Sequence, residues 1–279
     1  MLAVEIIEGC NFECYFCTAK DIKTPVYMDF DLFKRTILEA KELGITKINL
    51  TPCKGEPFLH PNIYEMLDFV NTHMKESMLF TNATAINVDK LKAIGLNNIV
   101  LCVSYYGSTI EKFNELTGMG NNLFKIFHRK LAELTDAGIK YDIHKRDDNY
   151  IFDYLEGPHI VKDDFDSTSK CKYHHEPKVF ANGDVTFCIF AREEFPTSDK
   201  IFFANVNNIS LKEALENPLR YKFYESQSIC AGRCSSYDRN CYIGHSIISL
   251  KTIMASKKKY LENKEVTDGL YKDIEDETI

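Results

Sequence analysis

Alternating strand-like and helix-like segments in the first half of the chain restrict its fold more than any other feature. Short apolar runs are each followed by a stretch in which apolar residues recur every three or four positions, and glycines end several of these stretches. We expect strands at 2–7, 47–50, 77–81, 99–103 and 140–144, with helices at 31–43, 63–73, 88–94 and 123–137. Strands that alternate with helices form a parallel sheet with right-handed crossovers. The sequence therefore predicts an α/β fold, a partial (β/α) barrel of about six strands that stays open on one side.

The pattern changes in the second half, which indicates a smaller α+β domain. Two short apolar runs flank Asn182-Gly183, a dipeptide typical of type I′ hairpin turns. Ser210 and Glu213 have the spacing of a capping box that opens a helix, and Pro218 interrupts that helix. We expect a barrel core at 1–160, a small cysteine-rich domain at 161–245, and a C-terminal helix with an acidic tail at 246–279.

Composition and charge exclude several classes of protein. The chain has 279 residues, 44% of them hydrophobic, and no apolar run approaches the length of a membrane span. Its formal charge of -7 argues against a nucleic-acid partner, because neutralising phosphates needs a basic face. Glu5 and Glu8 interrupt the first ten residues, which do not have the pattern of a secretory leader. We expect a cytoplasmic protein with reduced thiols, and no membrane partner.

Three closely spaced cysteines near the amino terminus carry the strongest chemical signal. Cys10, Cys14 and Cys17 have the spacing CxxxCxxC and follow the first predicted strand. Three thiolates are one too few for a closed tetrahedral site, so a cluster held here would keep one iron open to another ligand. Structural zinc is the alternative, but the next cysteine, Cys53, is far along the chain. A disulfide framework does not suit a reducing compartment.

The cysteine loop is rich in aromatic residues and resembles that of the radical S-adenosylmethionine (SAM) superfamily. In that family an aromatic residue takes the position held here by Phe16. The resemblance implies that Cys10, Cys14 and Cys17 bind a [4Fe-4S] cluster and that the methionine part of SAM chelates the fourth iron. It also implies that Phe16 contacts the cofactor.

Further segments resemble the same family, in the family's order. Gly55-Glu56-Pro57 is similar to the GGEP segment whose backbone contacts the amino group of the bound methionine, although Lys54 replaces the first glycine. Asn82 and Ser104 follow or end the third and fourth predicted strands, where polar residues of the family face the cofactor, and Ser104 is the candidate ribose contact. Considered alone, Gly-Glu-Pro is also typical of an ordinary turn, and a serine after a strand often begins one.

Cysteines in the second half resemble the auxiliary-cluster domains called SPASM and Twitch, which follow some radical SAM cores. The region offers five cysteines around a hairpin and a helix, too few for the two clusters of a full SPASM domain. The Twitch type, with one auxiliary [4Fe-4S] cluster, fits with ligands Cys171, Cys188, Cys230 and Cys234, and with Cys241 as an alternative to Cys234. A zinc knuckle that uses His174 or His175 is the alternative. Cys53 and Cys102 are expected to be buried thiols.

The resemblance implies a radical SAM enzyme of the oxidoreductase or maturase type. Such an enzyme cleaves SAM reductively to a 5′-deoxyadenosyl radical, which abstracts hydrogen from a small-molecule or peptide substrate, and an auxiliary cluster helps to oxidise that substrate. A flavodoxin- or ferredoxin-type protein would donate the electron. The alternative is a redox-neutral enzyme, such as an epimerase or a cross-linking peptide maturase, whose second lobe is a structural or docking metal module. An iron-sulfur electron carrier is a third interpretation, but a carrier needs no open iron. No catalytic base is identifiable from the sequence.

Overall fold

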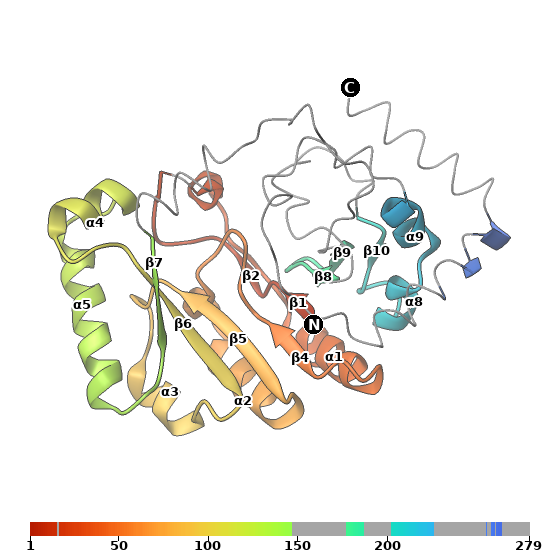
Figure 1. Cartoon of the computed structure of the whole chain (residues 1–279), viewed down its shortest axis with the longest axis horizontal. Helices are drawn as coiled ribbons and strands as arrows, with labels where there is room; N and C mark the ends of the chain where they lie inside the picture. The colour runs from red at the N-terminus through yellow and green to blue at the C-terminus, as the bar shows by residue number, and fades with distance from the viewer. Residues whose placement is uncertain are drawn as a thin grey trace.

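The computed structural model describes residues 1–15, 17–146, 177–186, 202–225, 255, 258–259 and 261–263. Within these residues, eight strands form one sheet in the order β10-β9-β8-β1-β4-β5-β6-β7 (Figure 1). The strands are β1 (Leu2–Val4), β4 (Lys47–Asn49), β5 (Glu76–Thr81), β6 (Ile99–Tyr105), β7 (Asp142–Lys145), β8 (Lys178–Val179), β9 (Asp184–Thr186) and β10 (Ala204–Asn205).

Six neighbouring strands of this sheet are parallel, as expected for a partial barrel. They run from β8 through β1, β4, β5 and β6 to β7, whereas β9 and β10 are antiparallel to their neighbours. The strand β6 is buried at five of its seven positions, since parallel strands have both faces covered. These observations confirm the α/β class and the parallel sheet.

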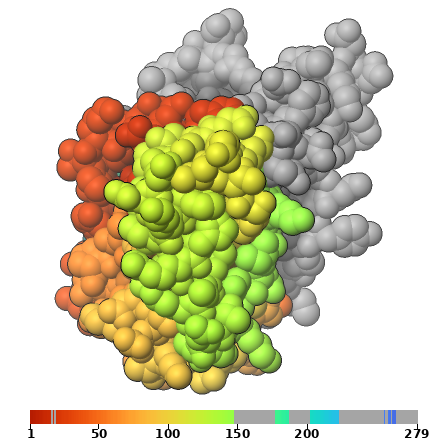
Figure 2. Space-filling view, turned by 90° about the vertical axis from the view of Figure 1, so that its left-hand side faces the viewer, coloured from red at the N-terminus to blue at the C-terminus, as the bar shows by residue number. Residues whose placement is uncertain are grey.

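Five helices follow the strands of the parallel part of the sheet, four of them predicted. They are α1 (Phe30–Glu42), α2 (Ile63–His73), α3 (Val88–Ile94), α4 (Ile110–Thr117) and α5 (Asn121–Asp136). The Asp29 carboxylate caps α1 by accepting from the backbone N–H groups of Asp31 and Leu32. The helix α4 was not predicted, and it packs with α5 at one end of the molecule, where both form the outer surface (Figure 2).

The predicted hairpin forms, but its turn is not of type I′. The strands β8 and β9 pair antiparallel, and the Gly183 N–H donates to the Phe180 carbonyl at 2.8 Å. Type I′ requires two central residues with positive φ, and only Gly183 has one, at 88°. Asn182 instead uses its side chain, which donates to Asp184 at 2.6 Å and accepts from the Asp184 N–H. The Asn-Gly dipeptide therefore predicted the location of the turn correctly and its type wrongly.

The second half of the chain packs directly against the barrel. The capping box of Ser210 and Glu213 opens α8 (Leu211–Leu215), and α9 (Pro218–Glu225) begins at the predicted interruption. Helix α8 contacts α1, where Glu39 accepts a hydrogen bond from the Leu211 N–H at 2.5 Å. The expected domain boundaries near 160 and 245, and most of 246–279, lie outside the described residues.

A buried ion pair joins the two halves of the sheet. Lys178, the first residue of β8, lies 2.5 Å from the carboxylate of Glu5, which follows β1, and both side chains are 1% exposed. The backbone continues this contact, because the Glu5 N–H donates to the Val179 carbonyl at 2.8 Å. In the described part of the chain, no helix has the length and apolar character needed to cross a bilayer.

Candidate active site

A cavity of about 250 Å³ opens at the carboxyl ends of the parallel strands. This is the edge at which open α/β sheets and barrels bind their ligands. Residues from the first cysteine loop, from the loop after β4 and from the ends of β5, β6 and β7 form its wall. They are Cys10, Phe12, Cys14, Cys17, Ala19, Thr51, Pro52, Cys53, Gly55, Glu56, Phe80, Thr81, Asn82, Ser104, Tyr106 and Arg146.

Close backbone contact holds the cysteine loop against the loop after β4. The cysteine loop lies between β2 (Ile7–Glu8) and β3 (Val26–Tyr27), which pair antiparallel. The Gly9 N–H donates to the Lys54 carbonyl at 2.7 Å, and the Glu56 N–H donates to the Gly9 carbonyl at 2.9 Å. A Cβ at Gly55 would lie 2.6 Å from the Ile7 carbonyl oxygen. Glycine is therefore required at position 55 for the two loops to meet.

The three predicted cysteines of the first loop all line this cavity. Cys10 accepts from the Phe12 N–H at 3.4 Å and Cys17 from the Ala19 N–H at 3.4 Å. Burial, with Glu56 and Cys17 nearby, raises the pKa of Cys10 to about 12, and burial with the two neighbouring cysteines raises the pKa of Cys14 further. Three neighbouring thiolates repel one another and are poorly solvated, so a bound cation is needed to stabilise their charged form. The donor set therefore fits a positively charged metal centre.

Aromatic rings back the cysteine loop and exclude water from one side of the cavity. The Phe12 ring lies 5.5 Å from that of Tyr106 and 5.6 Å from that of Phe113, measured between centroids. Phe12 and Tyr106 are both buried. Phe16, the aromatic residue predicted to contact a cofactor, lies outside the described residues.

Glu56 is a buried carboxylate that ties the loop after β4 to the end of β5. It accepts from the Thr81 hydroxyl at 2.6 Å and from the Asn82 N–H at 2.7 Å, and from the Phe58 N–H at 3.2 Å. Burial raises the pKa of Glu56 to about 7, although these hydrogen bonds favour the carboxylate. The next residue, Pro57, begins the short helix η2 (Pro57–Leu59), is buried and does not line the cavity.

The ends of β5, β6 and β7 contribute a polar wall. The Asn82 amide donates to the Asn11 side chain at 2.9 Å and lies 3.8 Å from the Cys10 sulfur. Ser104 accepts from the Arg146 guanidinium at 3.3 and 3.2 Å, and this guanidinium lies 5.6 Å from the centre of the Phe80 ring. Arg146 brings a positive charge into the cavity. Sequence reasoning missed it, because nothing in the sequence pairs it with Ser104.

Cys53 differs from expectation, since it is only partly buried and lines the cavity. The Lys178 ammonium donates to its sulfur at 2.7 Å. Burial alone would lower the pKa of Lys178, but Cys53 and Glu5 outweigh burial and hold that pKa above its ordinary value. Cys102 is buried as expected, but polar atoms of Asp142 and His144 lie within 4.8 Å of its sulfur. The predicted auxiliary ligands, Cys171, Cys188, Cys230, Cys234 and Cys241, all lie outside the described residues.

Sequence comparison identifies the family. Residues 4–145, about half of the chain, match the family model described as Radical SAM superfamily. The chain belongs to this superfamily. Its members use SAM and a [4Fe-4S] cluster, and the three cavity cysteines of this radical SAM protein fit such a cluster. The confirmed family agrees with the cysteine loop and the parallel sheet.

Two curated relatives match the barrel of this radical SAM protein. A GTP 3′,8-cyclase of Hydrogenovibrio crunogenus is 31% identical over 136 residues, which cover 45% of this chain and 39% of the relative. The mycofactocin maturase MftC of Mycobacterium ulcerans is 25% identical over 139 residues, which cover 49% of this chain and 37% of the relative. The chain thus spans less than half of the length of either relative.

Solved structures of radical SAM enzymes share the fold of this radical SAM protein over most of its length. BtrN in complex with AdoMet and 2-DOIA superposes with a TM-score of 0.59 at 16% identity, covering 88% of this chain and 94% of BtrN. The enzyme anSMEcpe with bound AdoMet superposes with a TM-score of 0.59 at 14% identity, covering 96% of this chain and 99% of anSMEcpe. At such identities the likeness shows the fold alone.

Proposed function

We propose that Cys10, Cys14 and Cys17 hold a [4Fe-4S] cluster and that SAM binds beside it in the cavity. The observation that carries this proposal is the position of the three cysteines on one wall of a cavity at the carboxyl edge of the sheet. Cys53, which also lines the cavity, is engaged by Lys178. When bound, the cluster and SAM supply reductive cleavage of SAM to methionine and a 5′-deoxyadenosyl radical.

The remaining cavity residues bind, orient and shield the cofactor. Arg146, held by Ser104, suits the carboxylate of the methionine part, and the Ser104 hydroxyl can turn toward the ribose. The backbone at Gly55 and Glu56, with the Asn82 amide, offers polar contacts for the methionine amino group. Phe12 and Tyr106 keep water from the reacting atoms. Phe16 and Pro57 complete the proposed set of cofactor-binding residues.

The test is cofactor cleavage by the anaerobically reconstituted full chain. With dithionite as reductant, the protein should convert SAM to 5′-deoxyadenosine, measured by chromatography. Cys14→Ala should abolish this conversion and lower the iron content. Tyr15→Phe is the matched control, because Tyr15 lies in the same loop, is 45% exposed and does not line the cavity. Its rate should match that of the parent, and cleavage that persists in Cys14→Ala would overturn the proposal.

A finer proposal concerns the substrate and the net reaction. We propose that the radical abstracts hydrogen from a small molecule or a peptide, and that an auxiliary [4Fe-4S] cluster held by Cys171, Cys188, Cys230 and Cys234, or Cys241 in place of Cys234, accepts an electron from it. The resemblance of the segment 161–245 to Twitch domains supports this. The names of one relative and two structural neighbours support the substrate class alone: a maturase, BtrN with 2-DOIA, and anSMEcpe with a Kp18Cys peptide at a TM-score of 0.53. A flavodoxin- or ferredoxin-type protein would reduce the first cluster.

A redox-neutral reaction is the second candidate, favoured by the relative named GTP 3′,8-cyclase. In that case the second region would serve as a structural or docking module. Once a substrate is found, the mass of its product separates the two proposals. A loss of two hydrogens supports oxidation, whereas an unchanged mass supports the redox-neutral reaction.

A further inference from the structure

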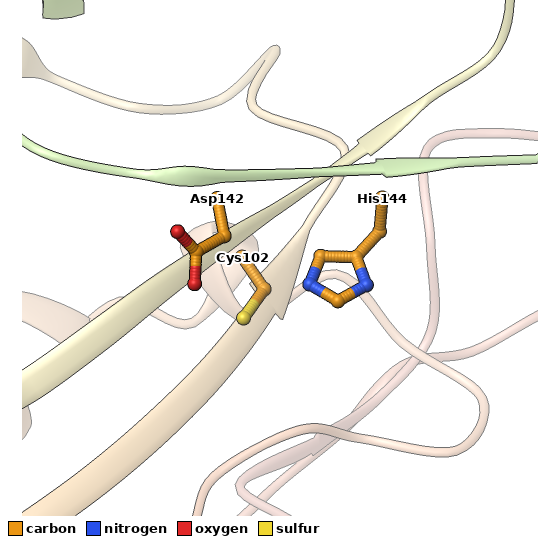
Figure 3. A group of neighbouring side chains, drawn as sticks. All are labelled: Cys102, Asp142 and His144. Atoms are coloured by element: carbon orange, nitrogen blue, oxygen red, sulfur yellow. The ribbon is translucent and has the colours of Figure 1, made fainter.

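A group of three metal-ligating side chains lies on the barrel sheet outside the cavity. Cys102 on β6 pairs in register with Asp142 on β7, and His144 follows two residues later on the same face of β7. Their ligand atoms, one sulfur, one carboxylate oxygen and one ring nitrogen, all lie within 4.8 Å of one another. Figure 3 shows the Cys102 sulfur between the Asp142 carboxylate and the His144 ring. None of the three is used in the proposed function.

We propose that Cys102, Asp142 and His144 bind one divalent cation of the Zn²⁺ type. Thiolate, imidazole and carboxylate are the ligands that Zn²⁺ takes in proteins, and three such ligands with one open position are typical of zinc sites that bind water or a ligand atom. One thiolate and one carboxylate balance the charge of the ion, so the complex is neutral. That neutrality allows it to lie near Arg146, which follows the last residue of β7.

The ligands are held in place before any ion binds. Two paired strands fix the separation of Cys102 and Asp142, and the Cys102 side chain is almost fully buried. The His144 ring lies against the Phe80 ring at a centroid distance of 4.6 Å, which restricts its rotation. Asp142 is exposed, which leaves a path for the ion from solvent. Binding would release the Cys102 thiol proton to solvent.

The position of this group connects it with the cavity. Ser104 follows Cys102 by two residues on β6 and pairs in register with His144, Arg146 directly follows the end of β7, and both line the cavity, as does Phe80. Two residues along a strand correspond to about 7 Å. The ion would therefore lie beneath the cavity, with its open position available to water or to an oxygen or nitrogen atom of a bound small molecule. This inference does not depend on the identity of the proposed cluster ligands.

Zinc binding by the reconstituted full chain tests the proposal. We would dialyse the cluster-loaded protein anaerobically against Zn²⁺, count zinc per chain, and determine affinity by competition with a chromophoric chelator. The parent should bind one zinc ion more than Cys102→Ala or His144→Ala, or bind it at least about a hundredfold more tightly, since loss of even an indirect partner weakens zinc sites by about 10–100-fold. X-ray absorption at the zinc edge should show a sulfur ligand that Cys102→Ala removes.

His73→Ala is the matched control for His144→Ala. The His73 ring stacks on the Phe69 ring at a centroid distance of 4.1 Å, whereas the His144 ring meets the Phe80 ring edge-on, and His73 is the last residue of α2. Its zinc binding should equal that of the parent. If Cys102→Ala does not fold, Asp142→Asn at an exposed position supplies the comparison. The inference would be overturned if the folded variants of Cys102, Asp142 and His144 bound as much zinc, and as tightly, as the parent. Iron content and SAM cleavage are measured separately and report on the proposed function.

Discussion

Gly55 shows at the scale of one residue how the candidate site is held together. We expect Gly55→Ala to destabilise the protein by about 1–3 kcal/mol, because the added methyl group would lie 2.6 Å from the Ile7 carbonyl oxygen and would push the two loops apart. The same change should reduce iron incorporation, since the cysteine loop loses its backbone bridge to Gly55. Urea unfolding and iron content are the measurements.

Gly120→Ala is the control for this change. A Cβ at Gly120 has no neighbour within 4 Å, and its φ of -83° suits any residue. Its unfolding free energy should stay within about 1 kcal/mol of the parent, with normal iron content. Equal stability of the two variants would contradict the steric account.

Glu56 gives the protein a predictable pH dependence. Its pKa in the folded chain is about 7, above the ordinary value of 4.5. The folded state therefore binds more protons than the unfolded state in this range, and stability falls as pH rises through it, by about 3 kcal/mol in total. Glu56→Gln should remove this contribution. Between pH 4.5 and pH 7 the parent should lose unfolding free energy relative to the Glu56→Gln variant. A difference between the two proteins that does not change with pH would contradict the raised pKa of Glu56.

Single residues also mark the limit of what the sequence can predict about the site. Cys10, Cys14, Cys17, Gly55 and Asn82 follow strand ends, and a parallel sheet brings all its carboxyl ends to one edge, so their common location was predictable. The contacts of Arg146 and Lys178 could not be predicted from the sequence. They depend on the register of neighbouring strands, and the Lys178 donor lies 125 residues from the Cys53 acceptor. The contacts of all these residues with a cofactor stay predictions.

At the scale of elements, length and periodicity decided which predictions succeeded. The helices α1, α2 and α3 lie within one residue of their predicted bounds, since each has a full apolar face and a clear end. The helix α4 was missed, although it is one residue longer than α3, because only Ile110, Phe113 and Leu116 among its eight residues are apolar. The two-residue strand β3 exists only through its pairing with β2, which no local pattern reveals. The predicted turn type was wrong because φ is positive at Gly183 but not at Asn182, whose side chain accepts from the Asp184 N–H.

The ion pair between β1 and β8 is expected to be important for stability. Lys178→Met should destabilise the protein by about 3–5 kcal/mol, because Glu5 would be left buried without a counter-charge. Lys47→Met is the matched control: Lys47 also lies 2.5 Å from a carboxylate, that of Glu76 on the adjacent strand, but both side chains are more than half exposed. That change should alter stability by no more than about 1 kcal/mol. Thermal and urea unfolding measure the stability of both variants. A similar loss of stability in Lys178→Met and Lys47→Met would show that burial does not strengthen the pair of Lys178 and Glu5.

At the scale of the whole molecule, the two halves should divide the chemistry between them. We expect about eight irons per reconstituted chain, falling to about four in a Cys171→Ala, Cys188→Ala double variant. This variant should still cleave SAM within about tenfold of the parent rate, because every proposed cofactor contact lies before residue 147, but it should not release oxidised product. Circular dichroism must show that it stays folded. Oxidised product at the normal rate would rule out the auxiliary cluster as an obligatory electron acceptor.

The continuation of the sheet from β1 into β8 also determines the order in which the chain can fold. The strand β1 is made first on the ribosome, yet one of its two neighbours, β8, is made more than 170 residues later. Until then the β1 edge offers unpaired backbone groups, and Glu5 has no counter-charge. While the second half is still being made, the barrel segment therefore exposes an unpaired strand edge, and such an edge favours aggregation of the nascent chain.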